Sequence, residues 1–357
     1  MMLATPEVLS FQGMKPGTTT TKQLKKDTGE PTRIKQKRGY EIWYYKMDPY
    51  RRVDVVIQND RIKSIVARFS EPQSVDKTAA RLKINKLVNT EIWNKTRTKL
   101  LGLTYPDCGV LFRFGKGDGR VTQIVIERLS VEPFLLRVEQ DSKHRYSQNL
   151  ADLRSALRLQ PKRARIHMWK ARILKSVGRF GEADQAISKA IEFGNGEAKM
   201  AAHAVRAEIL FELDQIDKAR EDVRVAIQSQ REDTKSSAYL IEGQIIRGTT
   251  GDDQAAIKVL MEAIRTAMPL AKSEDSPIRA ARALQNMVAA HFEIATIIGQ
   301  GQWKNRKESA LKWSRNATQL AERLYERTGD KGVRLRAKVR QLEVYASILD
   351  RKLDRVN

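Results

Sequence analysis

The spacing of apolar residues changes at about residue 144. Beyond that point Pro and Gly become sparse, and apolar residues recur at intervals of three and four, as in amphipathic α-helices. Small and apolar residues then repeat after 36 positions, and a shorter third set follows. The three sets are Ala171, Leu174, Gly178, Phe180, Ala183, Ile187, Ala190 and Ile191; Ala207, Leu210, Asp214, Ile216, Ala219, Val223, Ala226 and Ile227; and Gly243, Ile246, Ala256, Leu260, Ala263 and Ile264. This period predicts helical hairpins that bury their apolar faces by stacking on one another.

These positions resemble the tetratricopeptide repeat (TPR), a helix-turn-helix unit with small residues at three fixed places. Ala171, Ala183 and Ala190 occupy those places in the unit that fits best, where two antiparallel helices cross closely. The resemblance covers about residues 144–268. It implies a superhelical solenoid of stacked hairpins that binds other proteins.

In the TPR family the first helix of each hairpin lines the groove that holds the partner. Carried over by register, the groove residues are Arg165, Met168, Arg172 and Lys175 in the first unit, Ala204, Glu208 and Phe211 in the second, and Leu240, Gln244 and Arg247 in the third. Such a groove is basic at one end and suits a peptide with acidic residues. The family's clamp for a C-terminal carboxylate has Asn where this chain has Arg172, Glu208 and Gln244, so that activity is not expected.

The N-terminal region shows the alternation of a half-buried strand. Val53, Val55 and Ile57 are separated by Asp54 and Val56. The predicted elements are a short helix over 18–26, a basic loop over 33–38, strands over 40–45, 53–58 and 62–69, and a hairpin turn at Asn59-Asp60. This part of the chain is therefore expected to form a small antiparallel sheet.

Several short motifs in residues 9–70 are similar to the SmpA/BamE-like module. They are Gly13-Met14-Lys15-Pro16-Gly17-Thr18, Leu24, Gly29-Glu30-Pro31, Trp43-Tyr44-Tyr45 and the hairpin of residues 53–65. Members of that family are small envelope proteins that assist outer-membrane β-barrel assembly through protein contacts. The resemblance implies a non-catalytic role in the bacterial cell envelope.

A second, degenerate copy of this order is predicted over residues 76–140. Its segments are a helix over 82–86, a turn over 100–106, strands over 110–114 and 121–128, and a glycine-rich hairpin turn over 115–119. The expected fold class is α+β, with a small N-terminal α/β region of antiparallel hairpins followed by an all-α, TPR-like superhelical solenoid. The predicted domains are 1–75, 76–140 and 144–357, the last ending in capping helices.

A formal net charge of +23, spread along the chain, favours acidic partners. It leaves open an alternative function in nucleic-acid binding, in which cations hold phosphates and aromatic rings stack on bases. The residues for that alternative are Arg33, Lys35, Lys37, Arg38, Trp43, Tyr45, Arg51 and Arg52. The competing interpretation is that the aromatic rings pack inside the sheet and the cations are solvated.

The sequence offers little catalytic chemistry. The four histidines have no ligand or triad spacing, and no dinucleotide or phosphate-loop motif is present. The single cysteine, Cys108, is predicted to be a buried, inert thiol. We therefore predict a protein that is not an enzyme, without cofactor, metal site or transmembrane segment. Its location is open: the cell envelope if a signal sequence precedes these residues, and the cytoplasm otherwise.

Overall fold

The computed structural model places the chain in two compact units, Met1–Lys162 and Arg163–Asn357. We call them the N-terminal unit and the helical unit and describe each by itself. The structure describes all residues except 1–4, 95–97, 116–118, 142–145, 275 and 354–357. The central part of the glycine-rich turn predicted over 115–119 lies outside the described residues.

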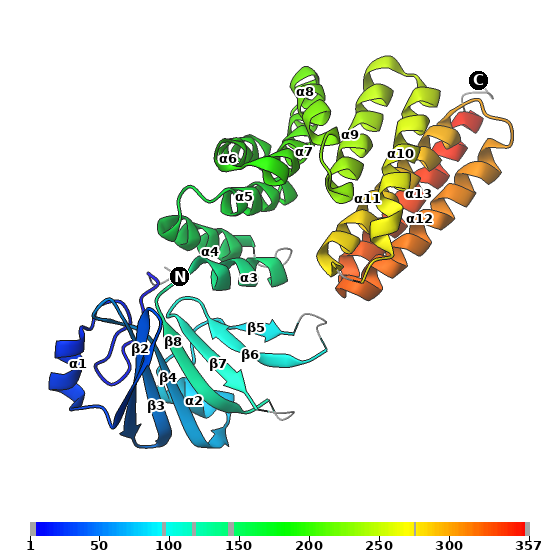
Figure 1. Cartoon of the computed structure of the whole chain (residues 1–357). Coiled ribbons are helices and arrows are strands. Elements are labelled where there is room, and N and C mark those ends of the chain that lie inside the picture. Colours follow the sequence, from blue (N-terminus) through cyan, green and yellow to red (C-terminus); the bar gives the residue numbers. More distant parts are fainter. Residues whose placement is uncertain (1–4, 95–97, 116–118, 142–145, 275, 354–357) are drawn as a thin grey trace. The chain divides into compact units, whose positions relative to one another are not determined.

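The N-terminal unit contains an eight-stranded antiparallel sheet (Figure 1). Its strands are β1 (Arg33–Lys37), β2 (Tyr40–Met47), β3 (Tyr50–Gln58), β4 (Arg61–Gln73), β5 (Thr90–Trp93), β6 (Leu100–Tyr105), β7 (Val110–Phe114) and β8 (Val121–Glu127), in the order β1-β2-β3-β4-β8-β7-β6-β5. Strands from both predicted N-terminal modules thus share one sheet, because β4 pairs with β8. The boundary between the compact units also lies at 162/163, beyond the start of the helical domain that we predicted at 144.

The hairpin of β3 and β4 follows the sequence pattern closely. Asn59 and Asp60 both have positive φ angles, 52° and 57°, as a two-residue hairpin turn requires. Val53 and Val55 are completely buried in the sheet core. Asp54 points to the other face, where Arg52 and Arg68 donate hydrogen bonds to its carboxylate.

Three predictions for other segments were wrong. The basic loop predicted over 33–38 is largely the edge strand β1, and the turn predicted over 100–106 is largely β6. The helix predicted over 82–86 consists of turns that follow the helix Val75–Arg81. All five residues of β1 are exposed, so the strand carries no apolar alternation. Gly102 lies within β6, and this position requires glycine because an added Cβ would overlap the carbonyl oxygen of Phe112 on β7.

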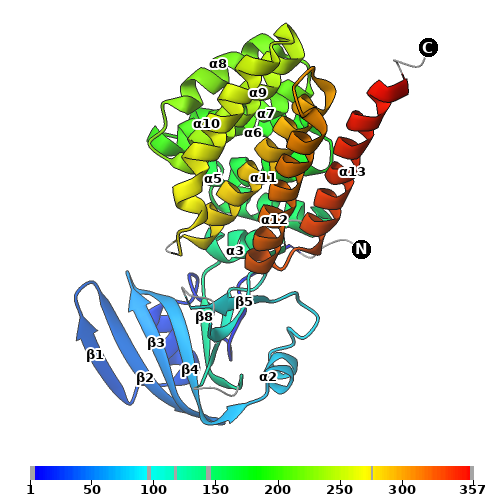
Figure 2. The same ribbon diagram turned by 90° about the vertical axis from the view of Figure 1, so that its right-hand side faces the viewer.

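Four helices among the described residues of the N-terminal unit accompany the sheet (Figure 1). They are α1 (Thr21–Thr28), α2 (Val75–Arg81), α3 (Val131–Asp141) and α4 (Tyr146–Leu159). Figure 2 shows two of them, α2 and α3, from another side. Leu24 of α1 is completely buried in the sheet core, and Cys108 is also buried, as predicted. Burial raises the pKa of the Cys108 thiol to about 12, which disfavours the reactive thiolate.

Arg137 of α3 connects the helices of this unit to its sheet. Its guanidinium donates to Asp152 of α4 through Nε (2.8 Å) and Nη2 (2.6 Å). Nη1 donates to Asp107 Oδ2 at 2.8 Å and to the Val88 carbonyl oxygen at 2.7 Å. Because Arg137 is 3% exposed, these bonds join α3, α4 and two sheet connections in a water-poor environment.

The helical unit is a series of antiparallel helices, each packed against the next (Figure 1). They are α5 (Ala164–Ser176), α6 (Phe180–Phe193), α7 (Gly196–Glu212), α8 (Ile216–Ile227), α9 (Glu232–Thr250), α10 (Asp253–Ala271), α11 (Pro277–Gln300), α12 (Arg306–Thr328) and α13 (Lys331–Leu353). The predicted solenoid is confirmed. The small residues of the repeat, Ala171, Ala183, Ala190, Ala207, Ala219 and Ala226, are all completely buried between helices.

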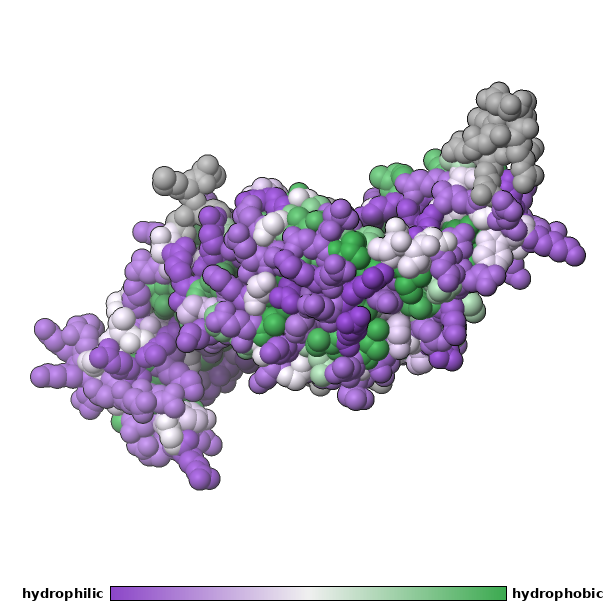
Figure 3. All heavy atoms as spheres, turned by 90° about the horizontal axis from the view of Figure 1, so that it is seen from above, coloured by the Kyte–Doolittle hydropathy of each residue, from purple (hydrophilic) through white to green (hydrophobic). Residues whose placement is uncertain are grey.

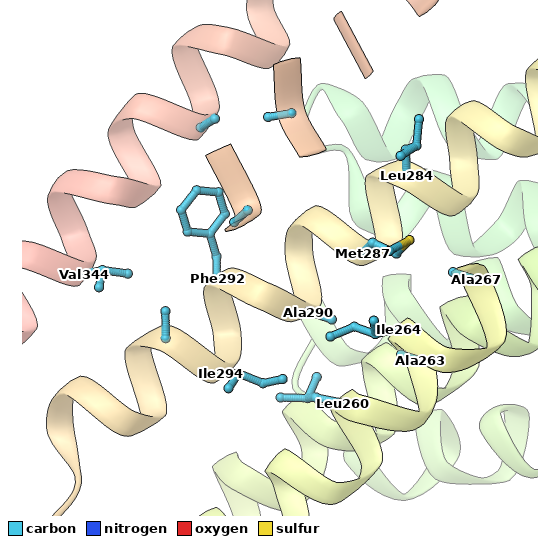
Figure 4. Close-up of a cluster of buried hydrophobic side chains, with 14 of the residues drawn as sticks. Leu260, Ala263, Ile264, Ala267, Leu284, Met287, Ala290, Phe292, Ile294 and Val344 are labelled. Carbon is cyan, nitrogen blue, oxygen red and sulfur yellow. The ribbon is translucent and has the colours of Figure 1, made fainter. Parts of the chain in front are cut away.

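The apolar core continues beyond the region of TPR resemblance. Figure 4 shows α11 between two partners: Ile294 and Ala290 lie toward Leu260 and Ile264 of α10, and Phe292 points away from them. Phe292 is 1% exposed. The long helices after residue 276 therefore extend the same stacked core. In such an array each hairpin buries its apolar face against the next one.

Gly243 takes the small-residue position in the third hairpin. A Cβ added to Gly243 would lie 2.7 Å from Cγ of Leu260, which is completely buried and has no space to move. We expect Gly243→Ala to lower the free energy of unfolding of the helical unit by about 1–3 kcal/mol through overpacking. Thermal unfolding followed by circular dichroism measures this.

Gly248 is the matched control, because it lies on the same helix α9 with no atom within 4 Å of an added Cβ. Gly248→Ala should stabilise α9 by up to about 1 kcal/mol, since Ala has the higher helix propensity. Equal effects of the two substitutions would contradict close packing of α9 on α10.

Candidate functional site

The first helices of successive hairpins are adjacent to one another: α5 contacts α7, α7 contacts α9, and α9 contacts α11. We call the face formed by these four helices the first-helix surface. The groove residues predicted from the sequence lie on α5, α7 and α9. The TPR-like order of the helices thus brings side chains from residues 165 to 247 onto neighbouring helices.

Much of the predicted charge on this surface is paired within the chain. Lys175 of α5 forms an ion pair with Glu208 of α7. Arg247 of α9 binds Glu293 of α11 (Nη1 to Oε2, 3.2 Å), and Gln244 donates to the same carboxylate at 3.3 Å. Arg340 of α13 also binds Glu293, at 2.6 Å. These pairs connect α5 to α7, and α11 to both α9 and α13, and they leave less free charge for a partner than the sequence suggested.

The predicted apolar residues of the surface are partly committed to packing. Phe211 and Leu240 are half-buried and pack against core clusters of the helical unit. Ala204 is buried, at 3% exposure. Met168 is half-buried on α5, and Arg165 is exposed at the start of that helix. A partner would therefore meet a mixed surface with small apolar areas.

Asp233 is the centre of a charge cluster that the sequence analysis missed. Its carboxylate is completely buried and binds Arg231 (2.9 Å), Arg279 (3.2 Å) and Arg282 (3.1 Å). Burial alone would raise the pKa of Asp233, but the three arginines hold it below its usual value of 3.8. The available sequence signal was the pattern of these charges. Asp233 lies in the first turn of α9, two residues after Arg231, and Arg279 and Arg282 are three residues apart on α11.

Arg172 lies beside this cluster with no ion pair or hydrogen bond to any residue that the structure describes. Its guanidinium is 5.6 Å from the centre of the Trp169 ring and close enough to Arg282, Arg231, Glu208 and Asp233 for their charges to act on it. Burial, followed by the positive charge of Arg282, lowers the pKa of Arg172 to about 9. Arg172 is therefore a cation with anions nearby but with no carboxylate in ion-pair contact among the described residues.

The alternative nucleic-acid site needs a correction. Trp43 and Tyr45 are 4% and 3% exposed and belong to the sheet core, so neither ring is free to stack on a base. Tyr44 is only half-buried, but the guanidinium groups of Arg33 and Arg52 already lie over its ring at 5.9 Å and 5.2 Å. Lys35, Lys37, Arg38 and Arg51 are exposed. Without available rings, the aromatic part of the predicted single-strand site is absent from the described surface.

The described residues hold no group of three or more His, Cys, Asp or Glu side chains that is arranged to bind a metal ion. None of the helices searched combines the length and apolar character that a membrane span requires. The face of the molecule in Figure 3 is largely hydrophilic, with apolar residues scattered in small groups.

Residues 164–193 match the family model described as "Tetratricopeptide repeat". This span coincides with the hairpin of α5 and α6. No curated protein sequence matches the chain. The resemblance of residues 9–70 to the SmpA/BamE-like module stays a prediction.

Three solved structures are similar at low identity. MamA is 15% identical, and the match covers 53% of this chain and 95% of MamA, with a TM-score of 0.33. PilF of Pseudomonas aeruginosa is 16% identical over 63% of this chain and 95% of PilF, with a TM-score of 0.36. YrrB, described as a TPR protein with an unusual peptide-binding site, is 16% identical over 58% of this chain and 99% of YrrB, with a TM-score of 0.30.

The assignment of the helical unit rests on the matched repeat and on the order of its helices. Buried small residues recur at the places that the repeat requires, from Ala171 to Gly243. The chain therefore contains a tetratricopeptide repeat within a TPR-like helical unit, which is the fold of a protein–protein interaction scaffold.

Proposed function

We propose that the chain is a non-catalytic scaffold that binds an acidic segment of a partner protein on the first-helix surface. Arg172 is the residue that contacts the partner's carboxylate in this proposal. Arg165 and Met168, two other predicted groove residues, lie on the same helix α5 and flank the segment in this proposal.

The observation that carries the proposal is the uncompensated charge around Arg172. Arg172, Arg231, Arg279 and Arg282 place four guanidinium groups around Asp233, and the carboxylates of Asp233 and Glu232 neutralise only part of that charge. Burial lowers the pKa of Arg282 as well as that of Arg172. A carboxylate between these two arginines would relieve their repulsion, and arginine suits carboxylates because its donors form a planar fork.

The first test uses a fluorescein-labelled decapeptide of glutamate, titrated with the full chain and followed by fluorescence anisotropy. Arg172→Ala should weaken binding by about tenfold, the effect of losing one charge-assisted hydrogen-bonding group. The interaction should also weaken as salt rises, because both partners are charged.

Arg224→Ala is the matched control, since Arg224 is exposed on α8 and the substitution removes the same charge. This variant should bind the acidic peptide within about twofold of the parent chain. Equal losses for Arg172→Ala and Arg224→Ala would mean that net charge alone attracts the peptide, and the assignment of Arg172 would be withdrawn.

We extend the proposal to cell-envelope assembly on the resemblance of residues 9–70 alone. Fractionation of the native host tests this extension. Recovery of the protein in the envelope fraction would support it, and recovery only in the cytoplasmic fraction would reject it while leaving the binding function of the helical unit intact.

A further inference from the structure

A cleft of about 1140 Å³ lies within the N-terminal unit. Its walls are the segment from Thr5 to Gln12, the end of α2 with the residues that follow it to Val88, and one side of α4, together with two short segments, Pro49-Tyr50 and Asp107-Cys108. We call it the N-terminal cleft. Its volume is sufficient for a small organic ligand, because such sites usually enclose about 300–1,000 Å³.

Part of the wall is apolar. Phe11, Tyr50 and Ile84 line the cleft and are at least nine-tenths buried. Leu9 and Leu87 are half-buried beside them. These residues provide a surface against which an alkyl or aryl group of a ligand can be removed from water.

Cations line the remaining wall from two sides. Arg154 and Arg158 are exposed one turn apart on α4, so both side chains lie on the same side of that helix. Lys83 and Lys86 follow α2 on the other wall. None of these four side chains forms an ion pair with any residue in the described part of the chain.

The carboxylates of the cleft are largely paired with other cations. Glu7 forms an ion pair with Lys15 at 2.5 Å. Asp107 and Asp152 share the single guanidinium of Arg137, at 2.8 Å and 2.6 Å, which leaves one negative charge of this pair over. That one charge is outnumbered by the four cations Arg154, Arg158, Lys83 and Lys86. The cleft combines an apolar wall with an excess of positive charge.

We propose that the N-terminal cleft binds an amphiphilic anion, a small molecule with an apolar body and a phosphate or carboxylate head group. The head group binds Arg154 and Arg158 of α4, and the apolar body lies against Phe11, Ile84 and Leu87. This site is separate from the first-helix surface and does not depend on the function proposed for it.

The test is isothermal titration calorimetry of the full chain with decyl phosphate below its critical micelle concentration. We expect saturable binding of one molecule per chain. Arg154→Ala combined with Arg158→Ala should weaken it by at least about tenfold, because two charge-assisted contacts are lost. Arg154→Lys with Arg158→Lys should retain part of the affinity, since the charge remains.

Lys35→Ala with Lys37→Ala is the matched control. Both lysines are exposed on β1 in the same unit and outside the cleft, and the substitutions remove the same two charges. This variant should bind decyl phosphate within about twofold of the parent chain. Circular dichroism confirms that each variant is folded.

Three ligands separate the contributions of charge and apolar body. Decanoate should bind, because it is also an anion with an alkyl chain of similar length to that of decyl phosphate. Inorganic phosphate should bind much more weakly than decyl phosphate, and decyltrimethylammonium should not compete. Equal binding of the cationic amphiphile, equal binding of inorganic phosphate, or unchanged affinity of the arginine-to-alanine variant would each overturn the proposal.

Discussion

Asp233→Ala is expected to lower the free energy of unfolding of the helical unit by about 3–5 kcal/mol, the usual cost of breaking a buried ion pair from one side. Asp233 is completely buried at the start of α9 and is the shared acceptor for Arg231, Arg279 and Arg282. Its removal leaves three guanidinium groups that repel one another and Arg172. Urea unfolding followed by helical circular dichroism measures the loss.

The neighbouring Glu232 is the control. Its side chain is 51% exposed, and Arg279 is its one ion-pair partner among the described residues, so Glu232→Ala should cost less than about 1 kcal/mol. Similar losses for the two variants would contradict the central role of Asp233.

The same carboxylate predicts a pH dependence. Because the arginines hold the pKa of Asp233 below 3.8 in the folded state, its stabilising contribution is present above that pH and is lost as the pH falls through the folded pKa. The difference in stability between the parent chain and Asp233→Ala should therefore be constant near neutral pH and shrink below about pH 4. A difference as large at pH 2 as at neutral pH would contradict this explanation.

The second large effect is expected in the N-terminal unit. Arg137→Ala removes the partner of Asp152, which is 1% exposed, and of Asp107, and it frees the Val88 carbonyl. We expect a loss of about 3–5 kcal/mol in that unit, because an uncompensated carboxylate stays buried. Differential scanning calorimetry should show the transition of the N-terminal unit at a lower temperature.

Arg154→Ala is the control on α4, since Arg154 is exposed and has no ion pair among the described residues. The unfolding temperature of the N-terminal unit should change little in this variant.

The loss of stability caused by Arg137→Ala should decrease in mild acid. Burial already raises the pKa of Asp152, and protonation of this carboxylate removes its charge. A pH-independent loss would indicate that packing of the arginine stem matters more than its charge.

The helical unit could be predicted from the sequence because its fold depends on a repeated local pattern. Ala171, Ala207 and Gly243 occupy the same place in three hairpins, and each is buried where two helices cross. Size at these positions is a strong constraint, since a larger side chain separates the helices. The spacing of such residues is visible in the sequence without knowledge of the partner surfaces.

The edge strands of the sheet could not be predicted in the same way. β1 exposes every side chain, so its Arg-Ile-Lys-Gln-Lys sequence has the composition of a loop. β6 contains Gly102 and is followed by Pro106, which favoured a turn, but the glycine is required by the close approach of β7. Pairing between β4 and β8 joins residues 48 to 63 positions apart, which single-strand patterns do not reveal.

The candidate site was predicted in part. Register placed Arg172 and its neighbours on the first helices, but charge alone could not show that Glu208 pairs with Lys175, or that Glu293 pairs with Arg247. Those pairs join helices that are distant in the sequence. The stacking role predicted for Trp43 and Tyr45 failed for a related reason, since alternation shows which faces differ but not which one is buried.

Site-specific photo-crosslinking in the native host tests the account most directly. A photoreactive phenylalanine derivative at Met168, on the first-helix surface, is compared with one at Val225, which is 36% exposed on the second helix α8. We predict crosslinks to a partner polypeptide from position 168 that weaken strongly when Arg172 is replaced by Ala, and few crosslinks from position 225. Crosslinks from position 225 alone, or crosslinks at 168 that do not respond to Arg172→Ala, would contradict the assignment of the first-helix surface as the binding site.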